Sequence, residues 1–433
     1  MFSKCEVLYG RNLEDISPPE IQLPIVNIGG NHKGNRYTVQ LNEQILSRHI
    51  LLVGGTGSGK TNLFYHIVDQ LKKKMTNDDV MLIFDTKGDF YQKFYSANDV
   101  VIGNSSEYYK QSAKWNLYEE VKAGGISDRR IVEDNVREIS NAIFHKRIQA
   151  NNSNPFFLNA ARDLFASIII VSIRDKQIYN NRDLKSFFEK STVDELIEIL
   201  CDHDDMRSVE TYIGGKAQVQ AQGVLSELYS VLRELFIGVF AEAGNFSIRK
   251  FIRNKGAKTA FVEYDLSIGE TISPLYSLLF DLALKEALGR NEHKGNVYII
   301  ADELKLLPDL KHIEDGINFG RSLGVKILAG LQTINQLNAV YENETQAENI
   351  INGFGSLFAF GACDYKSREF ITNAFGKKIV RDVYSTEKGE IIREQREGFT
   401  VEDWDLKELK IGEAVCGISS DPPFRFKFDL YQR

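Results

Sequence analysis

The fold is decided by the stretch Ile50-Leu51-Leu52-Val53-Gly54-Gly55-Thr56-Gly57-Ser58-Gly59-Lys60-Thr61. A short apolar segment, typical of a buried strand, runs directly into G-x-x-x-x-G-K-T, and residues 60–73 then show helical periodicity. In such a loop the backbone N–H groups curl around a polyphosphate, the lysine reaches the terminal phosphates, and the threonine hydroxyl binds Mg²⁺. The motif therefore predicts a nucleotide site whose contacts come from Gly54, Gly55, Thr56, Gly57, Ser58, Gly59, Lys60, Thr61 and Asn62.

A second motif ends an apolar strand pattern in two carboxylates, Val297-Tyr298-Ile299-Ile300-Ala301-Asp302-Glu303. A P-loop ATPase needs such a pair opposite its phosphates. Asp302 would hold the Mg²⁺ shell, and Glu303 would orient or deprotonate the attacking water. Paired acids at a strand end can also cap a following helix, but a P-loop in the same chain favours the catalytic interpretation. The two motifs together predict hydrolysis of ATP with Mg²⁺.

Two further polar residues follow at fixed distances from this pair. Gln332 lies twenty-nine residues after Glu303 (332 − 303), at the end of the strand pattern 325–331. Ligands bind at the carboxyl ends of strands in open α/β sheets, so Gln332 is a candidate sensor of the γ-phosphate. Arg321 lies eighteen residues after Glu303 (321 − 303), at the outer end of the preceding helix pattern. It is either an exposed helix-end arginine favoured by the helix dipole or a group offered to a neighbouring subunit.

The remaining pattern predicts an α/β fold with a mostly parallel sheet, interrupted by an all-α region. Strand patterns alternate with helical ones before residue 122 and after residue 257, which is typical of a parallel sheet covered on both faces. Between them the strand signals vanish. The expected strands cover residues 37–41, 50–53, 80–84, 100–103, 259–262, 297–301, 325–329 and 356–360. The expected helices cover residues 60–73, 130–146, 156–174, 193–200, 217–236, 274–288, 310–322 and 334–340.

Composition limits the class of protein. The chain has 433 residues, of which 43% are hydrophobic and 26% charged, as in ordinary globular proteins. Neither a signal peptide nor a membrane anchor is recognisable, and the apolar run 164–173 predicts a buried helix, so we expect a cytoplasmic protein. Cys5, Cys201, Cys363 and Cys416 show no paired spacing, which favours reduced, buried thiols over a disulfide or zinc site.

The net charge of −7 argues against a surface that is basic throughout, but a ring-shaped motor needs positive charge only along its channel. The basic clusters 72–74, 129–130 and 377–378 are more typical of solvated faces than of a nucleic-acid site. Two lysine-bearing segments, 214–216 and 305–311, are candidate pore or DNA-contacting loops because they lie near motor elements.

Several motifs, in this order, resemble those of the type IV coupling proteins of the TraD/TrwB type, the conjugative DNA-transfer ATPases of the FtsK/HerA P-loop superfamily. The resemblance runs from about residue 40 to the end of the chain. Besides the P-loop, its motifs are Ser47-Arg48-His49, Phe84-Asp85-Thr86-Lys87-Gly88-Asp89, Asn154-Pro155-Phe156-Phe157, Ala160-Ala161-Arg162, Gly244-Asn245-Phe246-Ser247-Ile248, Ala301-Asp302-Glu303, Gly320-Arg321-Ser322, Gly330-Leu331-Gln332, Gln336-Leu337 with Tyr341, and Leu409-Lys410-Ile411-Gly412-Glu413-Ala414.

This resemblance implies a RecA-like nucleotide-binding domain, interrupted by an all-α domain and assembled as a homohexameric ring that moves DNA through its pore. In the resemblance Arg321 matches an arginine finger that acts across a subunit boundary, and Gln332 matches the sensor. Relaxase or secretion-channel proteins are the implied further partners. The expected division is a short β-rich extension over residues 1–48, the RecA-like domain over 49–122 and 257–433, and the all-α domain over 123–256.

The chain departs from the family pattern because no N-terminal transmembrane helices are recognisable, which leaves recruitment to a membrane channel open. One alternative is a nucleotide-gated adaptor that docks relaxase or effector proteins without moving DNA. Another is a soluble HerA-like DNA motor in defence or repair. A GTPase switch is disfavoured, because D-x-x-G and T-K-x-D overlap within residues 85–89 and one short segment cannot serve two separate contacts.

Overall fold

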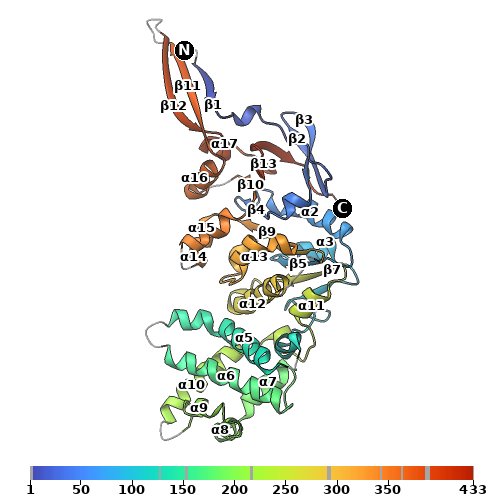
Figure 1. The fold of residues 1–433 in the computed structure, drawn as a ribbon, viewed down its shortest axis with the longest axis vertical. Coiled ribbons are helices and arrows are strands. Elements are labelled where there is room, and N and C mark those ends of the chain that lie inside the picture. The colour runs from blue at the N-terminus through green and yellow to red at the C-terminus, as the bar shows by residue number, and fades with distance from the viewer. Residues whose placement is uncertain are drawn as a thin grey trace.

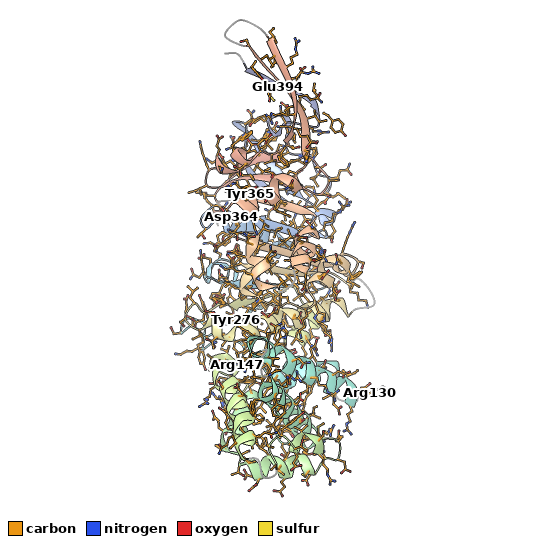
Figure 2. All side chains as sticks on the ribbon, turned by 90° about the vertical axis from the view of Figure 1, so that its left-hand side faces the viewer. Arg130, Arg147, Tyr276, Asp364, Tyr365 and Glu394 are labelled. Carbon is orange, nitrogen blue, oxygen red and sulfur yellow. The ribbon has the colours of Figure 1, made fainter. Side chains whose placement is uncertain are left out.

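The computed structural model describes residues 3–125, 128–151, 155–214, 218–289, 294–341, 344–361, 364–385 and 391–432. The molecule is elongated, with a bundle of helices at one end, a large sheet in the middle and a narrow three-stranded sheet at the other end (Figure 1). In the view turned by 90°, Arg130 and Arg147 lie in the helical part, and Glu394 lies in the three-stranded sheet (Figure 2).

The large sheet has eleven strands in the order β3-β2-β14-β13-β10-β4-β9-β8-β5-β7-β6. The strands from β10 to β6 run parallel, and β13, β14, β2 and β3 continue the sheet in antiparallel pairs. The bounds are β2 Val26–His32, β3 Asn35–Leu41, β4 Ile50–Val53, β5 Val80–Asp85, β6 Val100–Ile102, β7 Lys258–Glu263, β8 Val297–Ala301, β9 Val325–Leu331, β10 Ser356–Phe360, β13 Glu413–Ile418 and β14 Phe424–Phe428. The predicted α/β class with a mostly parallel sheet is confirmed.

Both faces of this sheet are buried. Alternate side chains of β4 belong to two separate apolar clusters, Ile50 and Leu52 on one face and Leu51 and Val53 on the other. On the first face lie α2 Lys60–Lys74 and α3 Asp89–Phe94, and on the second lie α12 Gly269–Leu288 and α13 Ile313–Phe319. The remaining helices of this part are α1 Glu43–Leu46, α11 Ile248–Asn254, α14 Asn335–Val340, α15 Glu344–Asn352, α16 Tyr365–Ala374 and α17 Asp403–Lys407.

The helical part contains no strand among its described residues, as the sequence predicts. After α4 Leu117–Val121, it consists of α5 Arg129–Ala150, α6 Phe156–Arg174, α7 Asn181–Lys190, α8 Val193–Cys201, α9 Arg207–Glu210 and α10 Gln218–Leu235. Among the described residues, α6 alone is long and apolar enough to cross a membrane by length and composition. Because 67% of its most apolar window is buried, its side chains form the core of this helical part.

The three-stranded sheet and the antiparallel pairing at the edge of the large sheet were not predicted, although the expected strand 37–41 is found within β3. Strand β1 Ser3–Tyr9 pairs with β11 Lys377–Ser385, which pairs with β12 Ile391–Phe399. The N-terminal residues do not form one β-rich extension. Strand β1 joins this small sheet, whereas β2 and β3 join the large one.

One predicted helix begins earlier than expected, although the new start places a proline inside the helix. Helix α12 starts at Gly269 rather than at Pro274. Proline has no N–H for the carbonyl of Glu270, but the Ser273 hydroxyl donates to that carbonyl at 2.9 Å. The helix therefore tolerates Pro274 because a side chain replaces the missing donor.

Two expectations about surface and burial were wrong in part. The Lys72 ammonium pairs with Asp99 at 2.5 Å and its side chain is mostly buried, and Lys378 is buried as well, so neither belongs to a solvated cluster. Of the described cysteines, all are free thiols, but Cys5 is exposed and only Cys416 is fully buried. Cys363 lies outside the described residues, as do residues 215 and 216 of the candidate pore loop.

Candidate active site

The P-loop joins β4 to α2 at the carboxyl edge of the parallel strands. Two glycines adopt positive φ angles, Gly57 at 75° and Gly59 at 116°, which L side chains rarely adopt. Lys60 is the first helical residue and is buried, and its ammonium donates to the carbonyls of Gly54 at 2.6 Å and Gly55 at 3.2 Å. The loop thus has the strand–turn–helix geometry that the sequence predicts for phosphate binding.

Asp302 lies directly beside the P-loop threonine. Strand β8 ends at Ala301, and the Thr61 hydroxyl donates to Asp302 Oδ2 at 2.9 Å. The other carboxylate oxygen, Oδ1, is buried and has no hydrogen-bond partner among the described residues. Burial raises the pKa of Asp302 to about 6. The Thr61 hydroxyl and the Asp302 carboxylate thus lie side by side, and one carboxylate oxygen is free. These oxygen atoms match the ligands that Mg²⁺ takes beside nucleotide phosphates.

Glu303 is held by the candidate sensor. The Gln332 amide donates to Glu303 Oε2 at 2.8 Å, while Glu303 Oε1 is buried without a partner in the described part of the chain. Burial raises the pKa of Glu303, and the hydrogen bond from Gln332 opposes that rise. Glu303 precedes a 3-10 turn but makes no capping hydrogen bond, so the helix-cap alternative does not describe it.

The strand order explains how distant residues meet here. Strand β9, which ends just before Gln332, lies between the P-loop strand β4 and the acidic strand β8. Since these strands are parallel, Gly54, Gln332 and Asp302 follow strand ends at the same edge of the sheet. The structure therefore brings together Lys60, Thr61, Asp302, Glu303 and Gln332.

Arg321 is not part of this cluster. It lies in the 3-10 turn Gly320–Leu323, before the amino end of β9, is exposed, and forms no ion pair among the described residues. Seven strand residues at about 3.3 Å each separate the two ends of β9, so Arg321 lies on the order of 20 Å from its own P-loop.

The Asn62 side chain is engaged by the C-terminal segment rather than by the loop. Its amide donates to the carbonyl of Asp429 at 2.8 Å and accepts from the Tyr431 N–H at 2.8 Å. Within the predicted nucleotide set, the side chain of Asn62 therefore has a structural task.

Sequence reasoning did not assign a role to two glycines that support the P-loop. The N–H of Gly412 donates to the carbonyl of Ser58 at 2.9 Å, and the N–H of Gly55 donates to the carbonyl of Gly361 at 2.9 Å. A Cβ on Gly59 would lie 3.0 Å from the Cα of Gly412. The only sequence signal for this packing was the presence of Gly412 in a motif of the family resemblance.

Lys87, in the turn after β5, is a further residue to which the sequence motifs assigned no role. Burial lowers the pKa of Lys60 and raises that of Glu303, and the nearby positive charge of Lys87 acts to lower the pKa of both groups, so Lys87 lies at the same edge of the site. At the end of β5, the buried Asp85 carboxylate accepts from the N–H groups of Phe90 at 2.8 Å and Tyr91 at 3.0 Å. Asp85 thus fixes the start of α3.

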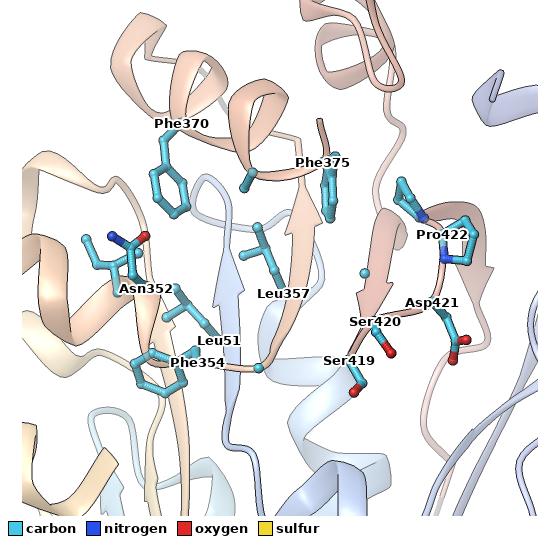
Figure 3. Close-up of a pocket in the computed structure, with 15 residues that line it drawn as sticks. Leu51, Asn352, Phe354, Leu357, Phe370, Phe375, Ser419, Ser420, Asp421 and Pro422 are labelled. Atoms are coloured by element: carbon cyan, nitrogen blue, oxygen red, sulfur yellow. The ribbon is translucent and has the colours of Figure 1, made fainter. Parts of the chain in front are cut away.

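A separate pocket of about 510 Å³ lies beside the P-loop strand β4, away from the nucleotide and acidic motifs. Leu51 and Leu357 contribute from β4 and β10, Phe370 from α16, Phe375 from the position that follows α16, and Ser419 from the segment after β13 (Figure 3). None of the nucleotide or acidic motif residues lines it. The site is therefore defined by the motifs at the strand ends, not by this pocket.

Comparison with known families gives a match over most of the chain. The family described as "Type IV secretion-system coupling protein DNA-binding domain" matches residues 36–403. The chain belongs to this family. A comparison with curated protein sequences gives no significant match.

Solved structures share the fold at low sequence identity. The bacterial conjugative coupling protein TrwBdeltaN70, in its unbound form, is similar with a TM-score of 0.76 and 20% identity, over 99% of this chain and 94% of that one. The plasmid coupling protein TrwB in complex with ADP and Mg²⁺ is similar with a TM-score of 0.71 and 21% identity, over 100% and 96%. VirB4 of Thermoanaerobacter pseudethanolicus is similar with a TM-score of 0.56 and 13% identity, over 96% and 99%.

Proposed function

We propose that this protein is an ATP-driven coupling ATPase that moves DNA in a transfer system, as a ring of six copies. The observation that carries the proposal is the convergence of Lys60, Thr61, Asp302, Glu303 and Gln332 at one edge of the parallel sheet. Family membership over residues 36–403 supports the assignment to DNA transfer.

The residues at this edge divide the work of hydrolysis. The amides of the P-loop and the Lys60 ammonium bind the phosphates, and Thr61 with Asp302 would hold Mg²⁺, whose chemistry is to neutralise charge on the β- and γ-phosphates. Glu303 orients the attacking water and accepts its proton. Gln332 fixes one oxygen of Glu303 and leaves the other free to face that water.

Arg321 completes the site of the next subunit. Its distance from its own P-loop excludes a contact in the same chain, and its exposure leaves the guanidinium available to a neighbour. A head-to-tail interface, repeated until the ring closes, would bring Arg321 to the phosphates of the adjacent nucleotide. An arginine finger of this kind contributes a factor of about 10³ to 10⁵ to the rate.

The direct test is the rate of ATP hydrolysis with and without single- and double-stranded DNA, over a series of salt and protein concentrations. Hydrolysis should rise more than linearly with protein concentration, because active sites are completed only on assembly. DNA should stimulate it, and the stimulation should fall with salt, since phosphate contacts release counterions. Monomers alone in the presence of ATP and DNA, observed by mass photometry, would contradict the ring.

The same measurements separate one alternative. A nucleotide-gated adaptor would hydrolyse ATP without responding to DNA. A HerA-like motor in defence or repair would also respond to DNA, and it would differ in needing no relaxase partner. Competition between ATP and GTP tests base preference, which matters because TrwB has also been solved with a GTP analogue. We further propose relaxase or secretion-channel proteins as partners, and a cytoplasmic location at the membrane surface where those partners recruit the protein.

A further inference from the structure

His49 directly precedes the P-loop strand and has an unusual backbone. Its φ angle is 62°, in the left-handed region that residues other than glycine uncommonly adopt. The residue is 1% exposed, and its ring packs edge-on against Phe354 at 6.4 Å between centroids. None of the contacts of the nucleotide site involves its side chain.

Both ring nitrogens of His49 bind the backbone on either side of Arg321. Nδ1 accepts from the N–H of Ile327 in β9 at 3.0 Å, and Nε2 lies 3.1 Å from the carbonyl of Ile317 in α13. Because the Ile327 N–H is a donor and the Ile317 carbonyl an acceptor, the ring is the neutral tautomer that carries its proton on Nε2. Burial lowers the pKa of His49 to about 4, which keeps this tautomer at neutral pH.

These two bonds close a loop whose tip carries the arginine. The segment between Ile317 and Ile327 leaves α13, forms the 3-10 turn with Arg321, and enters β9 through Gly324, whose φ is 76°. No ion pair of Arg321 itself fixes this turn among the described residues. The imidazole clamps both ends of the turn to the residue before the P-loop strand.

We propose that His49 is a positioning residue for Arg321, which aims the arginine at the neighbouring subunit's nucleotide. The inference rests on the proposed action of Arg321 across a subunit boundary. Although His49 precedes its own P-loop strand in the sequence, a substitution of His49 should therefore behave like a loss of Arg321 and not like a loss of the P-loop.

Mixing inactive variants distinguishes the two sides. The reference pair is Arg321→Ala with Glu303→Gln, in which about a quarter of randomly formed interfaces contain both intact groups, so hydrolysis should return. Mixed with Glu303→Gln, His49→Ala should restore hydrolysis to a similar extent, because each variant supplies the group that the other lacks. Mixed with Arg321→Ala, it should not restore hydrolysis, because neither variant supplies a correctly placed Arg321.

The opposite pattern would overturn the inference. If His49 acted on its own P-loop, His49→Ala would restore hydrolysis with Arg321→Ala and not with Glu303→Gln. Restoration with neither, or wild-type activity of His49→Ala alone, also contradicts it. If the reference pair itself shows no restoration although mixed rings form, either Arg321 acts within its own subunit or all sites of a ring must be intact. Rings doped with a minority of wild-type subunits separate these two outcomes.

A second variant keeps the test independent of folding. His49→Asn tolerates the positive φ and keeps an acceptor near Nδ1 for Ile327, but it cannot reach the carbonyl of Ile317. It should lower kcat less than His49→Ala, with ATP binding and thermal unfolding close to wild type. The matched control is His32→Asn, because His32 is also buried and bonded to a backbone carbonyl, that of Arg425 at 2.7 Å, on the far edge of the sheet. A loss of kcat in the control equal to that in His49→Asn would contradict the assignment.

Discussion

Two sets of buried carboxylates in this protein differ in how many of their oxygens are satisfied. Glu120, in α4, is fully buried and receives four donors, three of them at the N-terminus of α11. Oε1 accepts from the Trp115 indole at 2.9 Å and from the Ile248 N–H, and Oε2 accepts from the Ser247 hydroxyl at 2.8 Å and the Arg249 N–H at 3.2 Å. The positive end of the helix adds to their effect.

Asp302 and Glu303, by contrast, each leave one buried oxygen without a partner in the described part of the chain. Folding alone does not favour such an arrangement, because an unpaired buried acceptor costs about 1–3 kcal/mol. Both oxygens of Glu120 accept hydrogen bonds, whereas Asp302 and Glu303, just after the end of β8, each keep one oxygen that could accept a bond from a ligand. Glu120 thus stabilises the fold, whereas the free oxygens of Asp302 and Glu303 are a cost to stability that fits their proposed roles in catalysis.

The largest effect expected from this difference is on hydrolysis. Glu303→Gln preserves the shape of the side chain and removes the base, so kcat should fall by about 10²- to 10⁴-fold while ATP still binds. Steady-state kinetics with a fluorescent nucleotide titration measures both. Asp315→Asn, an exposed acid in α13, is the control and should leave kcat unchanged. Weak ATP binding by Glu303→Gln would mean that Glu303 is structural.

Glu120→Gln should have the opposite profile. The amide turns one acceptor into a donor that faces the donors already present, so the free energy of unfolding should fall by about 3 kcal/mol. Urea denaturation followed by tryptophan fluorescence is the measurement, since Trp115 contacts the mutated side chain. Hydrolysis per folded molecule should stay within about twofold of wild type. An unchanged free energy of unfolding would show that the four hydrogen bonds to Glu120 do not stabilise the fold.

Local motifs account for what the sequence predicted correctly. The strand–loop–helix of the P-loop, the acidic end of β8 and the helices of the all-α part each depend on neighbouring residues, and each is found where the pattern indicates. The contact between Thr61 and Asp302 joins residues 241 positions apart, yet both follow the carboxyl ends of parallel strands at the same edge of the sheet, where only β9 separates β4 from β8.

The strands that sequence reasoning missed have weak local patterns or distant partners. Strand β2 contains Gly29 and Gly30, which weaken its strand pattern; it pairs along its length with the neighbouring β3, and at Gly30 and Asn31 it pairs with β14 from the other end of the chain. Strand β12 is exposed along most of its length and rich in charge, so it lacks the alternation that predicts a half-buried strand. The contacts of His49 likewise span 268 and 278 positions, and its positive φ has no signature in the sequence.

The smallest effect concerns the stability of the nucleotide-free protein and its dependence on pH. The folded-state pKa of Asp302, about 6, lies above its ordinary value of 3.8 because the carboxylate is buried. A raised pKa means that the folded state holds the proton more tightly than the unfolded state. The stabilising contribution is therefore complete below about pH 4 and is lost as the pH rises through 6. At pH 8 the ionised carboxylate is a buried charge that Thr61 and Lys60 compensate only in part.

Asp302→Asn removes this charge and retains an oxygen that accepts from Thr61. Without nucleotide and Mg²⁺, the variant should therefore be more stable than wild type at pH 8, by up to about 3 kcal/mol, since one pKa unit corresponds to about 1.4 kcal/mol. The gain should shrink as the pH falls and vanish near pH 4. Thermal unfolding of both proteins between pH 4 and pH 8 measures it. A gain that is equal at all pH values would assign the effect to packing instead of charge, and a loss at pH 8 would show that Asp302 is as well satisfied as Glu120.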